Sequence, residues 1–377
     1  MSAHPKLLYF VTEDWYFFSH RLSLALAAQK AGYEVVVVTR VSQHGELIRS
    51  HGLKLIHIEL SRRSRNPLKE LGVIFRLLSI YREQKPDIVH HVALKPVLYG
   101  SIAARLAGVP AVVNALAGLG FLFISKHWQA RVIRPLVESA FRLLLNRPNS
   151  RVLFQNPDDM ALLTSCGVLA SGQGVLIRGS GVSTTQFNAT SEVNGLPLVV
   201  LASRMLWDKG VGEFVEAVRQ LRGQGVVARF ALVGEGDPDN PASISHNQLS
   251  QWQDEGTIEW WGRRDDMPQV FAQSHIVCLP SYREGLPKVL IEAAACCRPI
   301  IATDVPGCRE IVHDGENGLL VPARDFRALA NALRQLIDNP SLRIVMGKHG
   351  REIVEKEFSI EHVVSQTLAL YKELIRS

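Results

Sequence analysis

The sequence predicts an α/β protein with two domains, each built around a doubly wound parallel sheet. The chain has 377 residues, which favours two domains over one. Short apolar strands alternate with segments of helical periodicity, and this alternation occurs in both halves of the chain. With 47% hydrophobic and 21% charged residues, the composition is that of a globular protein with material for two cores.

In the first half, apolar strands bounded by helices indicate a parallel sheet that is covered on both faces. The predicted strands are residues 7–11, 34–39, 53–60, 86–91 and 110–114. The predicted helices are residues 19–31, 67–83 and 95–107. In the first of these helices, Leu24, Ala25 and Ala28 recur at helical spacing and form the expected buried face.

The same alternation returns in the second half. The predicted strands are residues 196–203, 228–233, 258–261, 276–279 and 299–303, and the predicted helices are residues 210–221, 267–272 and 289–297. The polar stretch 184–195 lacks periodicity, so we expect one domain over residues 1–183 and a second over residues 196–360. Ligands of open α/β sheets bind at the carboxyl ends of the strands, so two such sheets predict a cleft with two ligand-binding rims.

Charge and cysteine usage exclude several classes of protein. The formal charge of +6 is too small to indicate a nucleic-acid partner, and it suits an anionic membrane face or phosphorylated substrates. The five cysteines form no Cys-x-x-Cys pair and no zinc-type spacing, which indicates a reducing compartment. No run of 18 apolar residues and no signal-peptide pattern occur, so we expect a cytoplasmic protein without a spanning helix.

Two glutamates, Glu284 and Glu292, are the most informative pair in the chain. Glu284 falls in the loop after the strand at 276–279, and Glu292 is expected two turns into the following helix. Helical spacing puts Lys288 and Glu292 on one face of that helix. Loop amides, a helix N-terminus and two carboxylates suit a ligand that combines phosphate with hydroxyls, such as a nucleotide sugar.

Several motifs resemble the retaining GT-B glycosyltransferases of glycosyltransferase family 4, over nearly the whole chain. The most specific motifs occupy residues 179–187, 203–210, 284–292, 299–303 and 317–321. The runs at 17–22 and 95–100 resemble a bacterial subgroup that builds surface polysaccharides on a polyprenyl carrier. The resemblance implies the GT-B fold, two Rossmann-like domains facing a central cleft, with the last helix, residues 361–377, packed back on the first domain.

The family match also implies roles for residues of the second domain. Arg204 and Lys209 are expected to grip the donor diphosphate, because Arg binds oxygens in a bidentate way and Lys adds a point charge. Glu284 is expected to approach the donor sugar and Glu292 to accept hydrogen bonds from the ribose. The matching motifs add further donor-binding candidates, which are Ser203, Gly285, Leu286 and Pro287. The alternative for each charged residue is a solvated or structural ion pair.

Two glycine-containing loops are expected to frame the base of the nucleotide. Gly234 begins a Gly-x-Gly pattern after one strand, and Arg263 follows Gly262 after the next strand. Asp237 and Asp239 spell an Asp-x-Asp pattern that holds a metal in another glycosyltransferase fold. Here we interpret it as a polar loop, because the GT-B class generally needs no bound metal, and we expect neither a metal nor a cofactor.

The first domain departs from the family pattern. Many members carry a histidine after the strand that ends here at Asn114, and this chain has none there. The remaining catalytic candidates are His91, with its neighbour His90, and His20, although a histidine is more often structural. Lys95 and Arg21 are candidates for an acceptor diphosphate, and residues 118–120 for the lining of the cleft.

Two basic segments of the first domain are candidates for membrane contact. Residues 121–147 mix aromatic side chains, leucines and arginines, as do basic amphipathic helices that lie in a membrane interface. Residues 61–69 add a basic loop. The alternative is an ordinary core helix with a solvated basic face and a surface loop.

Together these observations predict a hexosyltransferase. It would move a sugar, an N-acetylated hexose or a derivative, from a UDP-sugar to a saccharide linked to polyprenyl diphosphate. The process would be O-antigen, capsule or glycan biosynthesis, at the inner face of the cytoplasmic membrane and without nucleic acid. One alternative is a nucleotide-sugar 2-epimerase of the same fold, which would need no acceptor. Another is a non-catalytic scaffold in a polysaccharide assembly complex, which would have no reason to keep all four charged residues.

Overall fold

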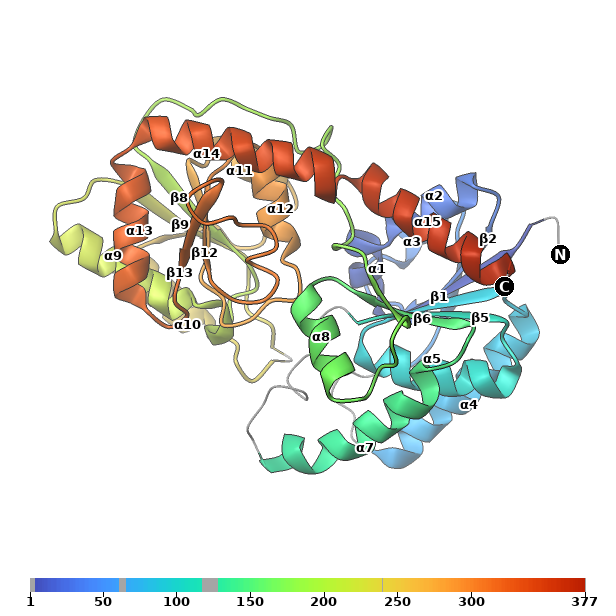
Figure 1. Ribbon diagram of the computed structural model, residues 1–377. Coiled ribbons are helices and arrows are strands. Elements are labelled where there is room, and N and C mark those ends of the chain that lie inside the picture. The colour runs from blue at the N-terminus through green and yellow to red at the C-terminus, as the bar shows by residue number, and fades with distance from the viewer. Residues whose placement is uncertain (1–3, 61–65, 117–127, 239, 377) are drawn as a thin grey trace. The chain divides into compact units, whose positions relative to one another are not determined.

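A computed structural model describes residues 4–60, 66–116, 128–238 and 240–376. The chain forms two compact units. Unit 1 comprises Met1–Gly181 and Ile360–Ser377, and unit 2 comprises Val182–Ser359. Figure 1 shows the first part of unit 1 in blue and green, unit 2 from yellow-green to red, and the returning last helix in red.

Unit 1 contains a seven-stranded parallel sheet with the strand order β3-β2-β1-β4-β5-β6-β7. Its strands are β1 Lys6–Glu13, β2 Glu34–Arg40, β3 Lys54–His57, β4 Ile88–Val92, β5 Ala111–Ala115, β6 Ser150–Phe154 and β7 Gly174–Leu176. Its helices are α1 Asp14–His20, α2 Leu22–Lys30, α3 Gly45–Ser50, α4 Pro67–Gln84, α5 Leu94–Ala107, α7 Trp128–Leu145, α8 Pro157–Ser165 and α15 Ile360–Arg376.

Buried side chains on the two faces of this sheet form separate cores. On one face, α2 and α15 pack side by side, although more than 300 residues separate them in the chain (Figure 1). On the other face, α4, α5, α7 and α8 contribute the buried side chains. Strands buried on both faces must be apolar throughout, as in the Val35–Val38 run of β2.

Unit 2 contains a six-stranded parallel sheet with the order β10-β9-β8-β11-β12-β13. Its strands are β8 Leu198–Ala202, β9 Arg229–Val233, β10 Glu259–Trp260, β11 Ile276–Leu279, β12 Ile300–Thr303 and β13 Gly318–Val321. Its helices are η1 Trp207–Lys209, α9 Val211–Gly223, α10 His246–Asp254, α11 Met267–Gln273, α12 Lys288–Ala295, α13 Phe326–Ile337, α14 Pro340–Ile353 and the π-helical η2 Val354–Phe358.

The predicted α/β class with two parallel sheets is confirmed, and three details differ from the expectation. The helix expected at 19–31 is two helices, because the backbone of Arg21 leaves the helical conformation (φ −128°, ψ −15°). The helix after Glu284 begins at Lys288, so Glu292 lies about one turn into it, not two. The stretch 184–195 belongs to unit 2, where Phe187 is buried in the core.

Candidate active site

The sheet of unit 2 has its topological switch point between β8 and β11. From β8 the chain builds outward through β9 and β10, and from β11 it builds the other way through β12 and β13. Loops at the carboxyl ends of two such strands diverge, which leaves a crevice where ligands of open α/β sheets bind. The loop after β8 carries Arg204 and Lys209, and the loop after β11 carries Glu284.

An ion pair joins these two loops across the switch point. Nζ of Lys209 donates to Oε1 of Glu284 at 2.5 Å, and both side chains are largely buried. The same carboxylate oxygen accepts a hydrogen bond from Ser281 Oγ at 2.6 Å, and the hydroxyl of Thr303 donates to the backbone carbonyl of Ser281. The structure thus brings Lys209 and Glu284 together, as a shared site requires. Lys209 and Ser281 both donate hydrogen bonds to the Glu284 carboxylate.

Gly210 lets the Lys209 loop approach β11 closely. Its backbone is left-handed (φ +71°), and a Cβ atom added there would lie 2.1 Å from the backbone oxygen of Pro280. Any other residue would combine conformational strain with a backbone collision. The glycine after Lys209 is therefore a requirement of the ion pair's geometry.

Glu292 lies on α12, on the same face as Lys288 as predicted, and the two form an i,i+4 ion pair at 3.0 Å between Nζ and Oε1. Burial raises the pKa of the Glu292 carboxyl, and the Lys288 ammonium opposes that shift. None of the described side chains caps the N-terminus of α12, which begins after Pro287. Its first backbone N–H groups, beside Gly285 and Leu286, are thus suited to an anionic ligand.

Arg204 forms an ion pair with Asp237, at 2.7 Å between Nη1 and Oδ2. Asp237 lies in the loop that Gly234 opens, so this loop meets the loop that carries Ser203 and Arg204. At Gly234 (φ +136°), an added Cβ atom would lie 1.9 Å from the backbone oxygen of Ser203. Sequence reasoning treated Asp237 only as part of a polar loop; its role as the partner of Arg204 required the fold.

The second loop expected near the base lies against the first. The backbone N–H of Gly234 donates to the carbonyl of Gly262 at 2.7 Å. Arg263, next in the chain, is exposed and pairs with Asp265 at 3.4 Å. The structure therefore brings the two backbone segments together but does not bring the Arg263 side chain to the Lys209–Glu284 pair.

The histidine candidates of unit 1 lie in different surroundings. His90 and His91 point to opposite faces of the sheet, as strand alternation requires. His91 is fully buried, and both its ring nitrogens have protein partners, Tyr81 Oη at 3.0 Å and Asn114 Oδ1 at 2.8 Å. Burial lowers the pKa of His91 to about 4. These contacts are those of a neutral structural histidine, which weighs against a catalytic role.

Among the remaining candidates of unit 1, His20 and Lys95 have partners within the domain. His20 ends α1, where its ring stacks on Tyr16 and its Nδ1 lies 2.6 Å from Ser19 Oγ. Lys95 pairs with Glu70 at 2.9 Å. Arg21 is buried at the start of α2. The candidates at 118–120, 121–127 and 61–65, and Asp239, lie outside the described residues.

Side chains that sequence reasoning missed complete the site in unit 2. Ser281 lies three residues before Glu284, but only the fold shows that its hydroxyl binds the carboxylate. Burial raises the pKa of the Cys308 thiol, so this cysteine near Glu284 stays neutral.

In the part of the chain that the structure describes, no group of three or more His, Cys, Asp or Glu side chains is placed to hold a metal ion.

Comparison with known proteins matches a family model to each half of the chain. Residues 6–156 match the model described as "Glycosyl transferase 4-like", and residues 196–339 match "Glycosyl transferases group 1". Over 370 residues the chain is 27% identical to the N,N'-diacetylbacillosaminyl-diphospho-undecaprenol alpha-1,3-N-acetylgalactosaminyltransferase of Campylobacter jejuni, covering 95% of this chain and 96% of the relative. It is 24% identical to the UDP-Gal:alpha-D-GlcNAc-diphosphoundecaprenol alpha-1,3-galactosyltransferase of Escherichia coli, covering 82% and 81%.

Solved structures share the fold over the full length. The sucrose-phosphate synthase of Thermosynechococcus elongatus superposes with a TM-score of 0.81 at 22% identity, covering 99% of this chain and all of that one. HepE of Anabaena in complex with UDP gives a TM-score of 0.77 at 19% identity, covering 98% and 100%. The motifs at the switch point, the two family models and these folds agree. The chain therefore belongs to glycosyltransferase family 4 and is a glycosyltransferase of the GT-B fold.

Proposed function

We propose that the protein is a retaining hexosyltransferase that moves a sugar from a UDP-sugar to a saccharide linked to polyprenyl diphosphate. The observation that carries this proposal is the Lys209–Glu284 pair at the switch point of unit 2, together with the N-terminus of α12, which none of the described side chains caps. Two relatives support the acceptor class, because both are named for acceptors linked to a diphosphate of undecaprenol. A structural neighbour bound to UDP supports the donor class.

Arg204 and Lys209 hold the donor diphosphate in this proposal. A lysine ammonium has three N–H groups, so Lys209 keeps its bond to Glu284 and donates to a phosphate oxygen with another. When the sugar leaves, the diphosphate gains negative charge, and fixed cations stabilise the transition state more than the bound donor. The N-terminal amides of α12 add to this stabilisation.

The two glutamates act on the two sugars of the donor. Glu284 lies in the loop with the ion pair, so its carboxylate accepts hydrogen bonds from hydroxyls of the transferred sugar and stabilises positive charge at its anomeric carbon. Glu292, one turn into α12, accepts hydrogen bonds from the ribose hydroxyls. Its raised pKa reflects burial, and a carboxylate in such a place binds hydroxyls more strongly than one in water.

Transfer proceeds on one face of the donor sugar in this proposal. The bond from the anomeric carbon to the diphosphate oxygen breaks, and the acceptor oxygen bonds to the same carbon from the same side. The departing phosphate oxygen takes the proton of the acceptor hydroxyl, so the protein need not supply a covalent nucleophile. The anomeric configuration is therefore retained.

Peripheral membrane association fits a lipid-linked acceptor. Within the described residues, no helix has both the length and the apolar character to cross a bilayer. On α7, Leu136 and Leu143 are 71% and 64% exposed, and Arg134 and Arg142 lie on the same helix. On α4, Phe75 is also exposed, and α4 and α7 both pack on α5. Exposed apolar side chains among arginines suit an anionic membrane interface.

The experiment is a transfer assay with a panel of UDP-hexoses and a synthetic polyprenyl-diphosphate-linked saccharide. We expect one hexose to add to the lipid-linked acceptor, with the donor's anomeric configuration in the product by NMR. An inverted product would contradict the retaining reaction. The control without acceptor tests the epimerase alternative, because an epimerised UDP-sugar would then accumulate.

A further inference from the structure

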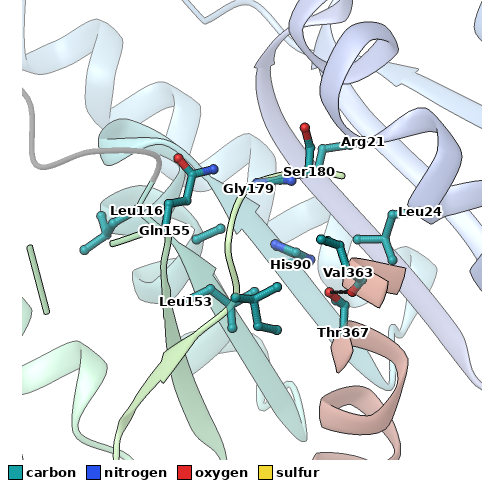
Figure 2. Close-up of a pocket in the computed structure, with 12 residues that line it drawn as sticks. Arg21, Leu24, His90, Leu116, Leu153, Gln155, Gly179, Ser180, Val363 and Thr367 are labelled. Carbon is teal, nitrogen blue, oxygen red and sulfur yellow. Dashed lines mark hydrogen bonds between the residues drawn. The ribbon is translucent and has the colours of Figure 1, made fainter. Parts of the chain in front are cut away.

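Unit 1 contains a small cavity at the carboxyl edge of its sheet. Its lining comes from β4, from the ends of β5 and β6, from the segment after β7, and from α2 and α15. The cavity volume is about 20 Å³, which is room for one water-sized group such as a single oxygen atom. Figure 2 shows His90 in the middle of the lining, with Gly179 and Ser180 on one side and Val363 and Thr367 on the other.

Two buried nitrogen atoms in this lining have no hydrogen-bond partner. They are Nε of Arg21, whose residue is 5% exposed, and Nε2 of His90, whose residue is 1% exposed. Nη1 of Arg21 makes a long contact of 3.4 Å with the backbone oxygen of His20. No carboxylate among the described residues forms an ion pair with Arg21. A buried guanidinium without a counter-ion is costly, so its position calls for an anionic partner.

A chain of hydroxyls determines which nitrogen of His90 carries the proton. Oη of Tyr9 lies 3.1 Å from Oη of Tyr371, which lies 2.5 Å from Nδ1 of His90. Burial and the charge of Arg21 lower the pKa of His90, so its ring is neutral with one N–H. An imidazole nitrogen accepts from a phenol more strongly than a phenol oxygen does, so we assign the Tyr371 hydroxyl as donor to Nδ1 and the ring proton to Nε2. The cavity then presents two N–H donors and one positive charge.

The location favours a ligand site over a packing defect. In the sheet of unit 1 the winding direction changes between β1 and β4, and Tyr9 of β1 pairs with His90 of β4. Ligands of open α/β sheets bind at such switch points. The wall formed by Gln155, Gly179 and Ser180 is only partly buried, which gives a ligand its way in.

We propose that this cavity, the Arg21–His90 pocket, binds one oxygen of a phosphate group, with Arg21 Nε–H and His90 Nε2–H as its donors. The proposal rests on the proposed function, because it identifies that phosphate as part of the diphosphate of the lipid-linked acceptor. The pocket is too small for a whole phosphate, so the other oxygens of the group lie at its partly exposed wall. A single oxygen between two N–H donors would also fix the depth at which the acceptor sits.

The test is thermal melting of the full chain with inorganic pyrophosphate, in saturating UDP so that the donor site is occupied. We expect pyrophosphate to raise the Tm of the wild type, and Arg21→Met to weaken its apparent affinity at least tenfold. Arg105→Met, which removes an exposed arginine of α5, is the matched control and should keep the response. Farnesyl diphosphate in place of pyrophosphate should give the same dependence on Arg21 if the ligand is the diphosphate of a lipid, and farnesol should give none.

Two further measurements test the roles of Arg21 and His90 separately. Without pyrophosphate, Arg21→Met should melt at or above the wild-type Tm, because it removes an uncompensated buried charge; a clear loss would show a structural role and overturn the proposal. In NMR spectra, the Nε2–H signal of His90 should shift on addition of pyrophosphate and disappear in Tyr371→Phe, where the ring exchanges between tautomers.

If UDP binds but pyrophosphate causes no Arg21-dependent shift in Tm, this inference alone fails. If UDP does not bind, the proposed function itself fails.

Discussion

Nζ of Lys209 lies 2.5 Å from Oε1 of Glu284, although 75 residues separate the two in the chain. Lys209 ends η1, the short helix after β8, and Glu284 lies in the loop after β11, so the pair bridges the switch point of the sheet. The charges neutralise each other in a largely buried place, where either one alone would be costly. In the proposed reaction, the same two groups serve the leaving diphosphate and the transferred sugar.

Replacing Glu284 by Gln should abolish sugar transfer while the protein stays folded. The amide keeps the size of the side chain but loses the charge that, in the proposed reaction, faces the anomeric carbon, and it leaves Lys209 without its charged partner. We expect kcat to fall at least a hundredfold, that is by about 3 kcal/mol. The measurement is transfer kinetics with circular dichroism as the check on folding. The exposed Glu216→Gln on α9 is the control, and equal activity of the two variants would refute the assignment.

Gly210→Ala should destabilise unit 2 far more than Gly225→Ala does. Both glycines are left-handed (φ +71° and +78°), so both substitutions carry a conformational cost of about 1 kcal/mol. Only at Gly210 does the added Cβ meet a backbone atom, at 2.1 Å from Pro280 O, whereas nothing lies within 4 Å at Gly225. We expect a further loss of about 2 kcal/mol or more in urea unfolding. Similar losses for the two variants would show that the close approach is unimportant.

The stability of the protein should depend on the protonation of His91. Its pKa is about 4 in the folded protein, whereas a histidine of the unfolded chain has its ordinary pKa of 6.5. Between pH 6.5 and 4 the unfolded chain binds a proton that folded His91 does not, so the unfolding free energy falls as the pH falls. The full effect is about 3 kcal/mol, and it is absent above pH 6.5.

His91→Gln should therefore weaken this pH dependence, because the variant lacks the one proton that His91 takes up on unfolding. The measurement is urea unfolding at pH 7 and pH 5. His90, whose pKa is also lowered, retains its own contribution in the variant. An unchanged pH dependence would mean that His91 titrates alike in both states.

A chelator should leave sugar transfer unaffected. In the proposed reaction, the fixed cations Arg204 and Lys209 and the α12 amides take the role that a metal ion has at the diphosphate in other folds. The measurement is transfer activity after dialysis against EDTA. Inhibition that Mg²⁺ or Mn²⁺ restores would overturn this prediction.

The local part of the site in unit 2 was accessible from sequence. Helical spacing put Lys288 and Glu292 on one face of a helix, and motif positions placed Arg204, Lys209 and Glu284 after strands. The order of the strands in the sheet determines which loops meet, and hydrophobic periodicity does not predict that order. The Lys209–Glu284 bridge and the Arg204–Asp237 pair therefore required the fold.

Less of the arrangement in unit 1 could be predicted from the sequence. Alternation correctly put His90 and His91 on opposite faces, but the partner of His90, Tyr371, lies 281 residues away on α15. The break at Arg21 was missed because apolar spacing continues through it, and that break is what separates α1 from α2. The structure places His91, a catalytic candidate, in the core, and it buries Arg21 with its Nε lacking a hydrogen-bond partner.

Calorimetric titration with UDP measures whether the loop that carries Lys209 holds the donor diphosphate. Wild type and Lys348→Ala, which removes an exposed lysine of α14, should bind UDP with the same affinity. Lys209→Ala should bind at least tenfold more weakly, because a charge-assisted hydrogen bond to phosphate contributes about 1.5 to 3 kcal/mol. Equal affinity of all three proteins for UDP would contradict a role of Lys209 in holding the diphosphate.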